Sequence, residues 1–185
     1  MLVLGLLMVT LAVQYGYTAP STETAECTTP KDELNEVKNC CKIKDAMISG
    51  AVEKCTELVK NVPANGTERR ELKPEGFDCF DDCVLVSLGF MGSDRKIDFA
   101  KIKSGEKAPW IETTSKGVDK CSASLTKPGD LCPSGADNFN KCLFRELYMN
   151  CPEEVWTKSD VCQRNIERLK KCPTSVPFHC TVFGH

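Results

Sequence analysis

Thirteen cysteines constrain this chain of 185 residues more than any other feature of its sequence. All of them lie between Cys27 and Cys180, and they are densest in the run from Cys132 to Cys162. A second, tighter signal is the stretch Cys79-Phe80-Asp81-Asp82-Cys83. In a secreted chain such a set forms disulfides rather than metal sites, and an odd count leaves six bridges and one further thiol. We therefore predict that these two stretches are joined to each other by disulfides.

The start of the chain indicates secretion. Met1 to Val13 is almost continuously apolar, is too short to span a bilayer, and is followed by small and polar residues as far as Ala25. This pattern predicts a signal peptide, placed at residues 1–19 with cleavage between 16 and 25. Residues 20–185 have the length of one domain with its own core, including a C-terminal extension at 152–185. No later segment is apolar enough to span a membrane, so we expect a secreted, extracellular protein.

Apolar residues recur at intervals of three and four along most of the remaining chain, which is the period of a helix. The clearest helical segments are 41–62, 77–88, 109–125, 137–150 and 159–171. Ser159-Asp160 is expected to cap the last of these, and Asp98 a further short helix through Ile102. No segment alternates in the manner of a strand. We predict an all-α fold of seven or eight short helices, cross-braced by about six disulfides.

The cysteine spacing separates the partners of neighbouring thiols. Cys79 and Cys83 are four residues apart, so they share one helix face and each can clamp a different neighbouring helix. Cys142 and Cys151 are nine residues apart, which at about 100° per residue places them on opposite sides of a straight helix. They therefore bind different neighbours, unless the helix ends before Cys151. The adjacent cysteines at 40–41 must also lead to different partners.

A helical cage braced in this way suits a protein built around an apolar cavity. A cavity removes packing contacts and costs stability in proportion to its volume, and disulfides offset that cost by constraining the unfolded chain. The same profile also fits a compact extracellular protein with no cavity. The residue pattern therefore leaves two functions open: a carrier of small molecules, and a disulfide-braced interaction or inhibitor module.

Charge and histidine content exclude several other functions. The net charge is −2 with acids and bases interspersed, so the basic stripe of a nucleic-acid-binding protein is absent. The chain has two histidines, at its extreme C-terminal end. Cys40 to Asp45 is similar to the Cys-Cys-x-x-His-Asp helix of secreted phospholipases A2, but Lys44 replaces the histidine that activates water, and we reject that function. The adjacent acids Asp81-Asp82 and Glu153-Glu154 diverge on a helix, and we interpret both pairs as solvated surface. We expect no enzyme activity, no cofactor and no metal.

Taken together, the cysteine spacing resembles that of insect odorant-binding proteins of the Plus-C subclass. The segments that carry the resemblance are Cys79-x3-Cys83 with Val84 to Gly89 and Lys96-Ile97-Asp98 after it, Cys142-x8-Cys151 with Pro152 directly after it, Cys40-Cys41 ahead of Cys55, and the later Cys162, Cys172 and Cys180. It covers nearly all of the chain after the leader. The resemblance implies the bridges Cys55–Cys83, Cys79–Cys142 and Cys132–Cys151, with Cys121 as an alternative to Cys132. The remaining bridges are drawn from Cys27, Cys40, Cys41, Cys121, Cys162, Cys172 and Cys180 and stay unassigned.

The resemblance implies a secreted carrier of small hydrophobic molecules, odorants or semiochemicals, in chemosensory fluid, with an odorant receptor as a further partner. Apolar ligands need mostly apolar walls with few polar anchors. The candidate wall residues are Phe80, Val84, Leu88, Phe90, Met91, Phe99, Trp110, Ile111, Val118, Phe139, Leu143, Leu147 and Tyr148. For each of them, ordinary core packing is the alternative. The Tyr148 hydroxyl could anchor a ligand or instead bond a backbone carbonyl.

Two further features concern the loops and the tail. Asn65-Gly66-Thr67 is a glycosylation sequon. The C-terminal tail is more apolar than a disordered terminus, through Phe178, Val182 and Phe183, and Cys180 would pin it as a lid over the pocket. His179 and His185 could make such a lid sensitive to mild acid, and two solvated histidines are the alternative. A homodimer through the tail or through the odd thiol also stays open.

Overall fold

This computed structural model describes residues 25–42, 46–60, 79–125 and 132–177, and the regular elements within them are all helices. The helices are α1 (Leu34–Lys38), α2 (Ala46–Lys60), α3 (Phe80–Ser87), α4 (Phe99–Gly105), α5 (Ile111–Cys121), α6 (Ala136–Met149) and α7 (Asp160–Lys171). Short 3₁₀ turns lie at Ala25–Cys27, Ser122–Ser124 and Glu153–Val155. These residues hold no strand, so the predicted all-α fold is confirmed. The signal peptide, the sequon at Asn65 and the tail from 178 onward lie outside the described residues.

Two of the helices begin at the residues that the sequence predicts. The Asp98 carboxylate accepts a hydrogen bond from the Lys101 backbone nitrogen at 2.9 Å, which caps α4. The Ser159 hydroxyl accepts one from the Cys162 backbone nitrogen at 3.2 Å, which caps α7. The start of α6 depends on backbone shape instead. Gly135 has a φ of +76°, and a Cβ there would lie 1.3 Å from the Leu125 carbonyl oxygen, so only glycine fits.

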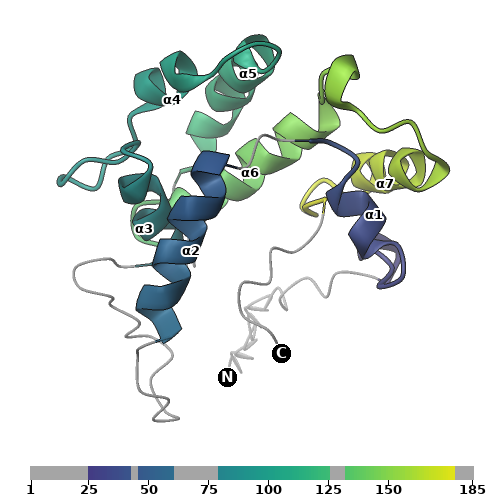
Figure 1. Ribbon diagram of the computed structural model, residues 1–185, viewed down its shortest axis with the longest axis horizontal. Helices are drawn as coiled ribbons and strands as arrows, with labels where there is room; N and C mark the ends of the chain where they lie inside the picture. The colour runs from purple at the N-terminus through teal and green to yellow at the C-terminus, as the bar shows by residue number, and fades with distance from the viewer. Residues whose placement is uncertain (1–24, 43–45, 61–78, 126–131, 178–185) are drawn as a thin grey trace, which may run out of the picture.

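Helix α6 occupies the middle of the molecule (Figure 1). It packs against α5 and α3, while α2 packs on α3 and α4 packs on α5. Helices α1 and α7 pack on each other at the other end of α6 (Figure 1). No helix within the described ranges is long and apolar enough to cross a membrane. Because α6 contacts both groups of helices, its faces decide how the two groups are held together.

Three disulfides fasten the N-terminal segment to the C-terminal one. They are Cys27–Cys172, Cys40–Cys162 and Cys41–Cys151, with sequence separations of 145, 122 and 110 residues. The prediction that the adjacent cysteines at 40 and 41 lead to different partners is therefore confirmed. In the chain-entropy model a single bridge that closes so long a loop contributes about 5 kcal/mol. These bridges stabilise a part of the molecule whose helices are short.

The other three disulfides brace the group from α2 to α6. They are Cys55–Cys83, Cys79–Cys132 and Cys121–Cys142. The implied bridge Cys55–Cys83 is present, and the stretches around Cys79 and Cys132 are joined, as predicted. The pairs Cys79–Cys142 and Cys132–Cys151, and the alternative of Cys121 with Cys151, are wrong.

The helix packing explains these corrections. Cys142 lies on the face of α6 that meets α5, where Cys121 is opposite it with the two Cα atoms 5.6 Å apart. Cys79 precedes α3 and lies beside Cys132, which precedes α6, with a Cα separation of 5.4 Å. Cys151 follows the end of α6 and lies beside Cys41. The expectation that Cys142 and Cys151 bind different neighbours is confirmed, and it is the choice of neighbour that the resemblance missed.

The buried apolar side chains form four clusters rather than one core. The first gathers around Val37, Trp110, Tyr148 and Leu169; the second around Ala51, Cys55, Cys83 and Val84; the third around Ile102, Val118, Cys121 and Phe139; the fourth around Leu85, Met91 and Ala136. Helix α6 contributes to the first, third and fourth. A division of this kind limits how much apolar surface each cluster can bury, which is consistent with the need for disulfides.

Candidate functional site

The predicted wall residues are distributed over the four apolar clusters. Phe80, Val84 and Leu88 belong to the second cluster; Phe90, Phe99, Val118, Phe139 and Leu143 to the third; Met91, with Phe90, to the fourth; and Trp110, Leu147 and Tyr148 to the first. Ile111 is 52% exposed and points away from all of them. It directly follows Trp110, and a step of about 100° around the helix carries its side chain off the buried face.

The third cluster holds most of the predicted wall residues. Its centre is Phe139, which is fully buried and lies against Phe99 with ring centroids 5.2 Å apart. Phe90 and Leu143 pack at its edge and are only partly buried. These side chains fill the space between α4, α5 and α6 with each other, as the alternative of ordinary core packing proposed.

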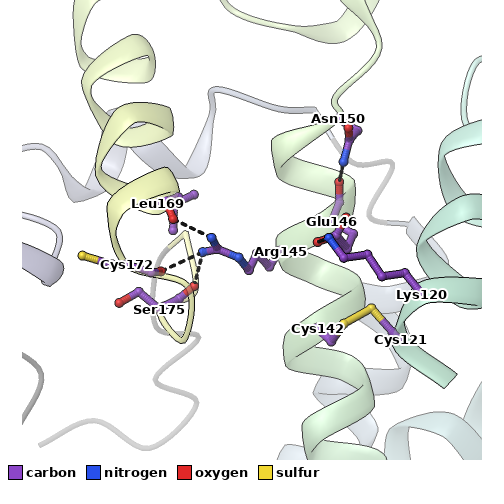
Figure 2. Close-up of polar contacts among 9 residues, drawn as sticks. All are labelled: Lys120, Cys121, Cys142, Arg145, Glu146, Asn150, Leu169, Cys172 and Ser175. Carbon is purple, nitrogen blue, oxygen red and sulfur yellow. Dashed lines mark hydrogen bonds and ion pairs between the residues drawn. A yellow bond between two sulfur atoms is a disulfide. The ribbon is translucent and has the colours of Figure 1, made fainter. Parts of the chain in front are cut away.

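The contact between α5 and α6, which we call the α5–α6 seam, links the first and third clusters. The buried face of α5 consists of Thr114, Gly117, Val118 and Cys121, with Trp110 one turn before. Leu143 of α6 lies so close to Gly117 that a Cβ there would be 2.9 Å from its Cδ1 atom. Glycine at 117 therefore allows the two helices to approach closely. The Cys121–Cys142 bridge closes one end of the seam (Figure 2).

A hollow of about 360 Å³ lies along the outer side of this seam. Its lining is Glu112, Thr113, Lys116, Gly117, Lys120, Glu146 and Asn150. Lys116 pairs with Glu112 at 2.6 Å and Lys120 with Glu146 at 2.7 Å (Figure 2 shows the second pair). The volume falls in the range of small-molecule sites, whereas the rim is charged and self-neutralising.

A second hollow of about 300 Å³ lies at the start of α7. It is lined by Trp156, Lys158, Ser159, Asp160 and Gln163. The side chains around both hollows are mostly charged or polar, and neither hollow is the enclosed apolar cavity that the sequence predicts. Each adjoins a predicted wall residue, because Gly117 on the seam lining contacts Leu143 and Trp156 on the other lining meets Tyr148. We take the seam hollow as the better candidate for a binding site because it is the larger and the more enclosed of the two.

The Tyr148 hydroxyl forms its hydrogen bonds within the protein. Its hydroxyl donates to the Val37 carbonyl at 3.4 Å and accepts from the Asn165 side-chain amide at 2.8 Å. Burial raises its pKa to about 12, and the bond from Asn165 opposes that shift. The Tyr148 ring meets Trp156 edge-on with centroids 5.6 Å apart. Of the two roles considered for this hydroxyl, bonding to a backbone carbonyl is the one observed.

Arg145 connects the other side of α6 to the end of α7. Its guanidinium donates to the backbone carbonyls of Leu169, Cys172 and Ser175 (Figure 2). Carbonyls in the last turn of a helix lack partners within the helix, so the guanidinium satisfies that of Leu169 and also ties down the two carbonyls in the segment after α7. Partial burial lowers the pKa of Arg145 from its ordinary value. Sequence reasoning missed this contact, because nothing in the pattern around residue 145 distinguishes it from a solvated arginine.

The acidic pair Asp81-Asp82 is not solvated surface, and that prediction is wrong. Asp82 is fully buried, accepts a hydrogen bond from the Ser134 hydroxyl and lies 3.7 Å from the Arg95 guanidinium. Burial raises the pKa of Asp81, and the Asn140 amide that donates to it at 2.8 Å opposes the shift. The loop before α6 covers this face of α3, which the sequence period does not reveal. Glu153 and Glu154 are exposed, as predicted.

One set of potential metal ligands occurs among the described residues. The sulfurs of Cys79 and Cys132 lie within 4.8 Å of each other and of a carboxylate oxygen of Asp82. Those two sulfurs are bonded to each other in a disulfide, so neither is a thiolate able to bind a metal. The grouping is a consequence of the bridge between the α3 and α6 segments.

Comparison with known proteins gives one informative match. No family model matches the chain, and no solved structure matches it. General odorant-binding protein 67 of Anopheles gambiae is 26% identical over 151 residues, which cover 73% of this chain and 72% of the mosquito protein. The chain is thus distantly similar to an insect odorant-binding protein. This similarity supports the resemblance found in the cysteine pattern and leaves the Plus-C subclass untested.

Proposed function

We propose that this protein is a secreted carrier that binds small hydrophobic molecules, of the odorant or semiochemical class, in chemosensory fluid. The observation that carries the proposal is the similarity to general odorant-binding protein 67 over about three quarters of each chain. The six disulfides among the described helices support it, because they fit an extracellular setting. An odorant receptor and a second copy of the chain are further proposed partners.

The mechanism of such a carrier is passive. Burial of about 300 Å² of apolar ligand surface at about 25 cal/mol per Å² contributes roughly 7.5 kcal/mol, and a micromolar dissociation constant corresponds to about 8 kcal/mol. Neither a nucleophile nor a general base is needed. We place the site at the α5–α6 seam, where the hollow of about 360 Å³ adjoins the partly buried Leu143 through Gly117.

One observation favours a compact interaction or inhibitor module instead. Most predicted wall residues of the third cluster pack against one another, and the side chains around the two hollows described are mostly charged or polar. A carrier with this structure must therefore admit its ligand by moving side chains such as Leu143, whereas a module needs no such movement. The two functions differ in whether the isolated protein takes up an apolar compound.

Binding of the apolar fluorescent probe N-phenyl-1-naphthylamine, followed by displacement with long-chain ketones and alcohols, tests the proposal. The matched variants are Gly117→Leu and Gly50→Leu. A side chain at 117 would meet Leu143 and project into the seam, whereas Gly50 is exposed on α2 with no atom within 4 Å of an added Cβ. Both variants replace a helical glycine, so their effects on helix propensity are alike. Thermal unfolding of each variant shows whether it is folded.

We expect saturable, displaceable binding by the unmodified protein and by Gly50→Leu, and at least tenfold weaker binding by a folded Gly117→Leu. Absence of saturable binding by the unmodified protein would refute the carrier and favour the module. Equal binding by all three proteins would keep the carrier and refute the seam as its site.

A further inference from the structure

Two polar atoms at the start of α5 are buried without a hydrogen-bond partner among the described residues. They are the indole Nε1 of Trp110 and the hydroxyl oxygen of Thr114. Trp110 is 4% exposed and Thr114 is 1% exposed. A buried donor without an acceptor costs about 1–3 kcal/mol, so two of them in one place are unusual for a structural position.

The two side chains share one face of the helix. The Thr114 backbone nitrogen donates to the Trp110 carbonyl at 2.8 Å, so the turn between them is helical. Residues four apart on a helix have Cβ atoms about 5–6 Å apart. This face is the one that continues through Gly117 and Val118 to Cys121 and meets α6. Both atoms therefore lie at the end of the α5–α6 seam that is remote from the Cys121–Cys142 bridge.

The acceptors described around this end of the seam are already engaged. The Asn150 carbonyl accepts from the Thr113 hydroxyl at 3.3 Å, and the Glu146 carbonyl accepts from the Asn150 amide at 2.9 Å. The Tyr148 hydroxyl donates to Val37 and accepts from Asn165. The Glu146 carboxylate pairs with Lys120. No described residue accepts from Trp110 or Thr114, and a molecule that enters the seam can supply the acceptor.

We propose that the Trp110 indole N–H and the Thr114 hydroxyl bind one neutral acceptor oxygen of the carried ligand, and so select apolar molecules that bear a ketone, ester or similar carbonyl. The proposal rests on the carrier function and assigns a polar anchor on the inner face of the seam. Neither side chain is on the lining of the hollow, so a ligand reaches them by passing between α5 and α6. An indole nitrogen can only donate, so the ligand atom must accept. The surroundings favour a neutral oxygen, because Trp110 packs in the first apolar cluster and a buried anion without a cationic partner is costly.

A pair of isosteric ligands tests the assignment. The compounds are 2-undecanone and 2-methyl-1-undecene, in which a methylene group replaces the carbonyl oxygen. Each is used to displace N-phenyl-1-naphthylamine from the unmodified protein and from Thr114→Val, Trp110→Phe and Thr56→Val. Valine matches the shape of threonine without its hydroxyl, and Thr56 is the control because it lies on α2, outside the seam, and its hydroxyl donates to the Val52 carbonyl at 2.7 Å.

We expect Thr114→Val and Trp110→Phe each to weaken ketone binding about fivefold, the effect of one hydrogen bond of about 1 kcal/mol. Alkene binding should stay within about twofold, and Thr56→Val should leave the ratio of the two affinities unchanged. A ketone-to-alkene ratio that is equal in all four proteins would overturn the assignment while leaving the carrier intact. If neither compound nor the probe binds the unmodified protein, the carrier function itself fails.

Tryptophan fluorescence gives an independent readout. The chain has two tryptophans, so Trp156→Phe leaves Trp110 as the only emitter. A hydrogen bond from the indole N–H to the ketone should shift the Trp110 emission to longer wavelength, and the alkene should not. The same shift with both compounds would contradict a hydrogen bond at this nitrogen, because it would report only a change in packing.

Discussion

The buried hydroxyl of Tyr148 links α6 to α1 and α7, and its titration can be measured without interference from other tyrosines. The other two tyrosines, Tyr15 and Tyr17, lie in the predicted signal peptide, so a chain that starts at residue 20 contains a single tyrosine. Burial raises the pKa of Tyr148 to about 12, compared with its ordinary value of 10.0. We therefore expect the ultraviolet absorbance of tyrosinate to develop with a midpoint near pH 12 in the folded protein and about 10 in denaturant.

The same shift predicts how stability depends on pH. Between about pH 10 and 12 the unfolded chain has lost the Tyr148 proton while the folded protein retains it. Unfolding then releases a proton, so the contribution of Tyr148 to stability is complete below pH 10 and decreases as the pH rises through this window. Unfolding by urea at several pH values measures the slope, and Tyr148→Phe should remove it.

Tyr148→Phe also tests the hydrogen bond from Asn165. The substitution leaves the Asn165 amide buried without its acceptor, whereas the Val37 carbonyl keeps the backbone nitrogen of Cys40 at 3.2 Å. One unsatisfied buried group predicts a loss of about 1–2 kcal/mol. For a chain of this length that lowers the melting temperature by about 2–8 °C. A titration midpoint near pH 10, or an unchanged free energy of unfolding in the Phe variant, would refute the buried hydrogen bond.

Three further perturbations test other parts of the molecule. Asp81→Asn should stabilise the protein at pH 7, because the raised pKa of Asp81 means that its negative charge opposes folding. The gain in the free energy of unfolding should vanish as the pH falls through that pKa, and urea unfolding at several pH values measures it. Gly50→Ala should stabilise α2 by about 0.5–1 kcal/mol, whereas Gly135→Ala should destabilise severely through the contact with the Leu125 carbonyl, and melting temperatures distinguish them. Thiol titration in denaturant without reductant should find one thiol per chain, at Cys180, because the other twelve cysteines are paired. A disulfide-linked dimer would give no free thiol and would migrate at twice the mass on a non-reducing gel.

The helices and their caps were predictable because they depend on nearby residues. Asp98 and Ser159 each begin a helix by accepting a bond from a backbone nitrogen three residues later, which is a local property. Cysteine spacing likewise predicted that the adjacent Cys40 and Cys41 form disulfides with different partners. It could not predict that Cys142 meets Cys121, because spacing along a helix fixes the face of a side chain and leaves open which neighbour covers that face.

Some residues of the candidate site were likewise predictable from local sequence, and others were not. The apolar period correctly placed Trp110 and Leu143 in buried positions facing other helices. It gave no reason to single out Gly117, whose importance is the close approach of Leu143, or Thr114, whose hydroxyl matters because no described residue accepts from it. Both depend on how α5 and α6 come together. The prediction that Asp82 is solvated was wrong for a related reason. The segment that buries it contains Ser134, which lies 52 residues further along the chain.

The disulfides are distributed unevenly around α6, and this leaves one end of the α5–α6 seam without a covalent link. Two disulfides fasten the segment around α1 to α7 and its end, and a third, Cys41–Cys151, fastens it to the end of α6. Arg145 adds bonds from α6 to carbonyls at and after the end of α7. On the opposite side of α6 a single bridge, Cys121–Cys142, holds α5 at its C-terminal end. The N-terminal end of α5, with Trp110 and Thr114, is held by packing and by hydrogen bonds such as that from Thr113 to Asn150. Separation of the helices at that end breaks no covalent bond and exposes two donors that already lack partners. This arrangement is what the proposed binding of a ligand at the seam requires, because the two helices can part at that end while the Cys121–Cys142 bridge stays intact.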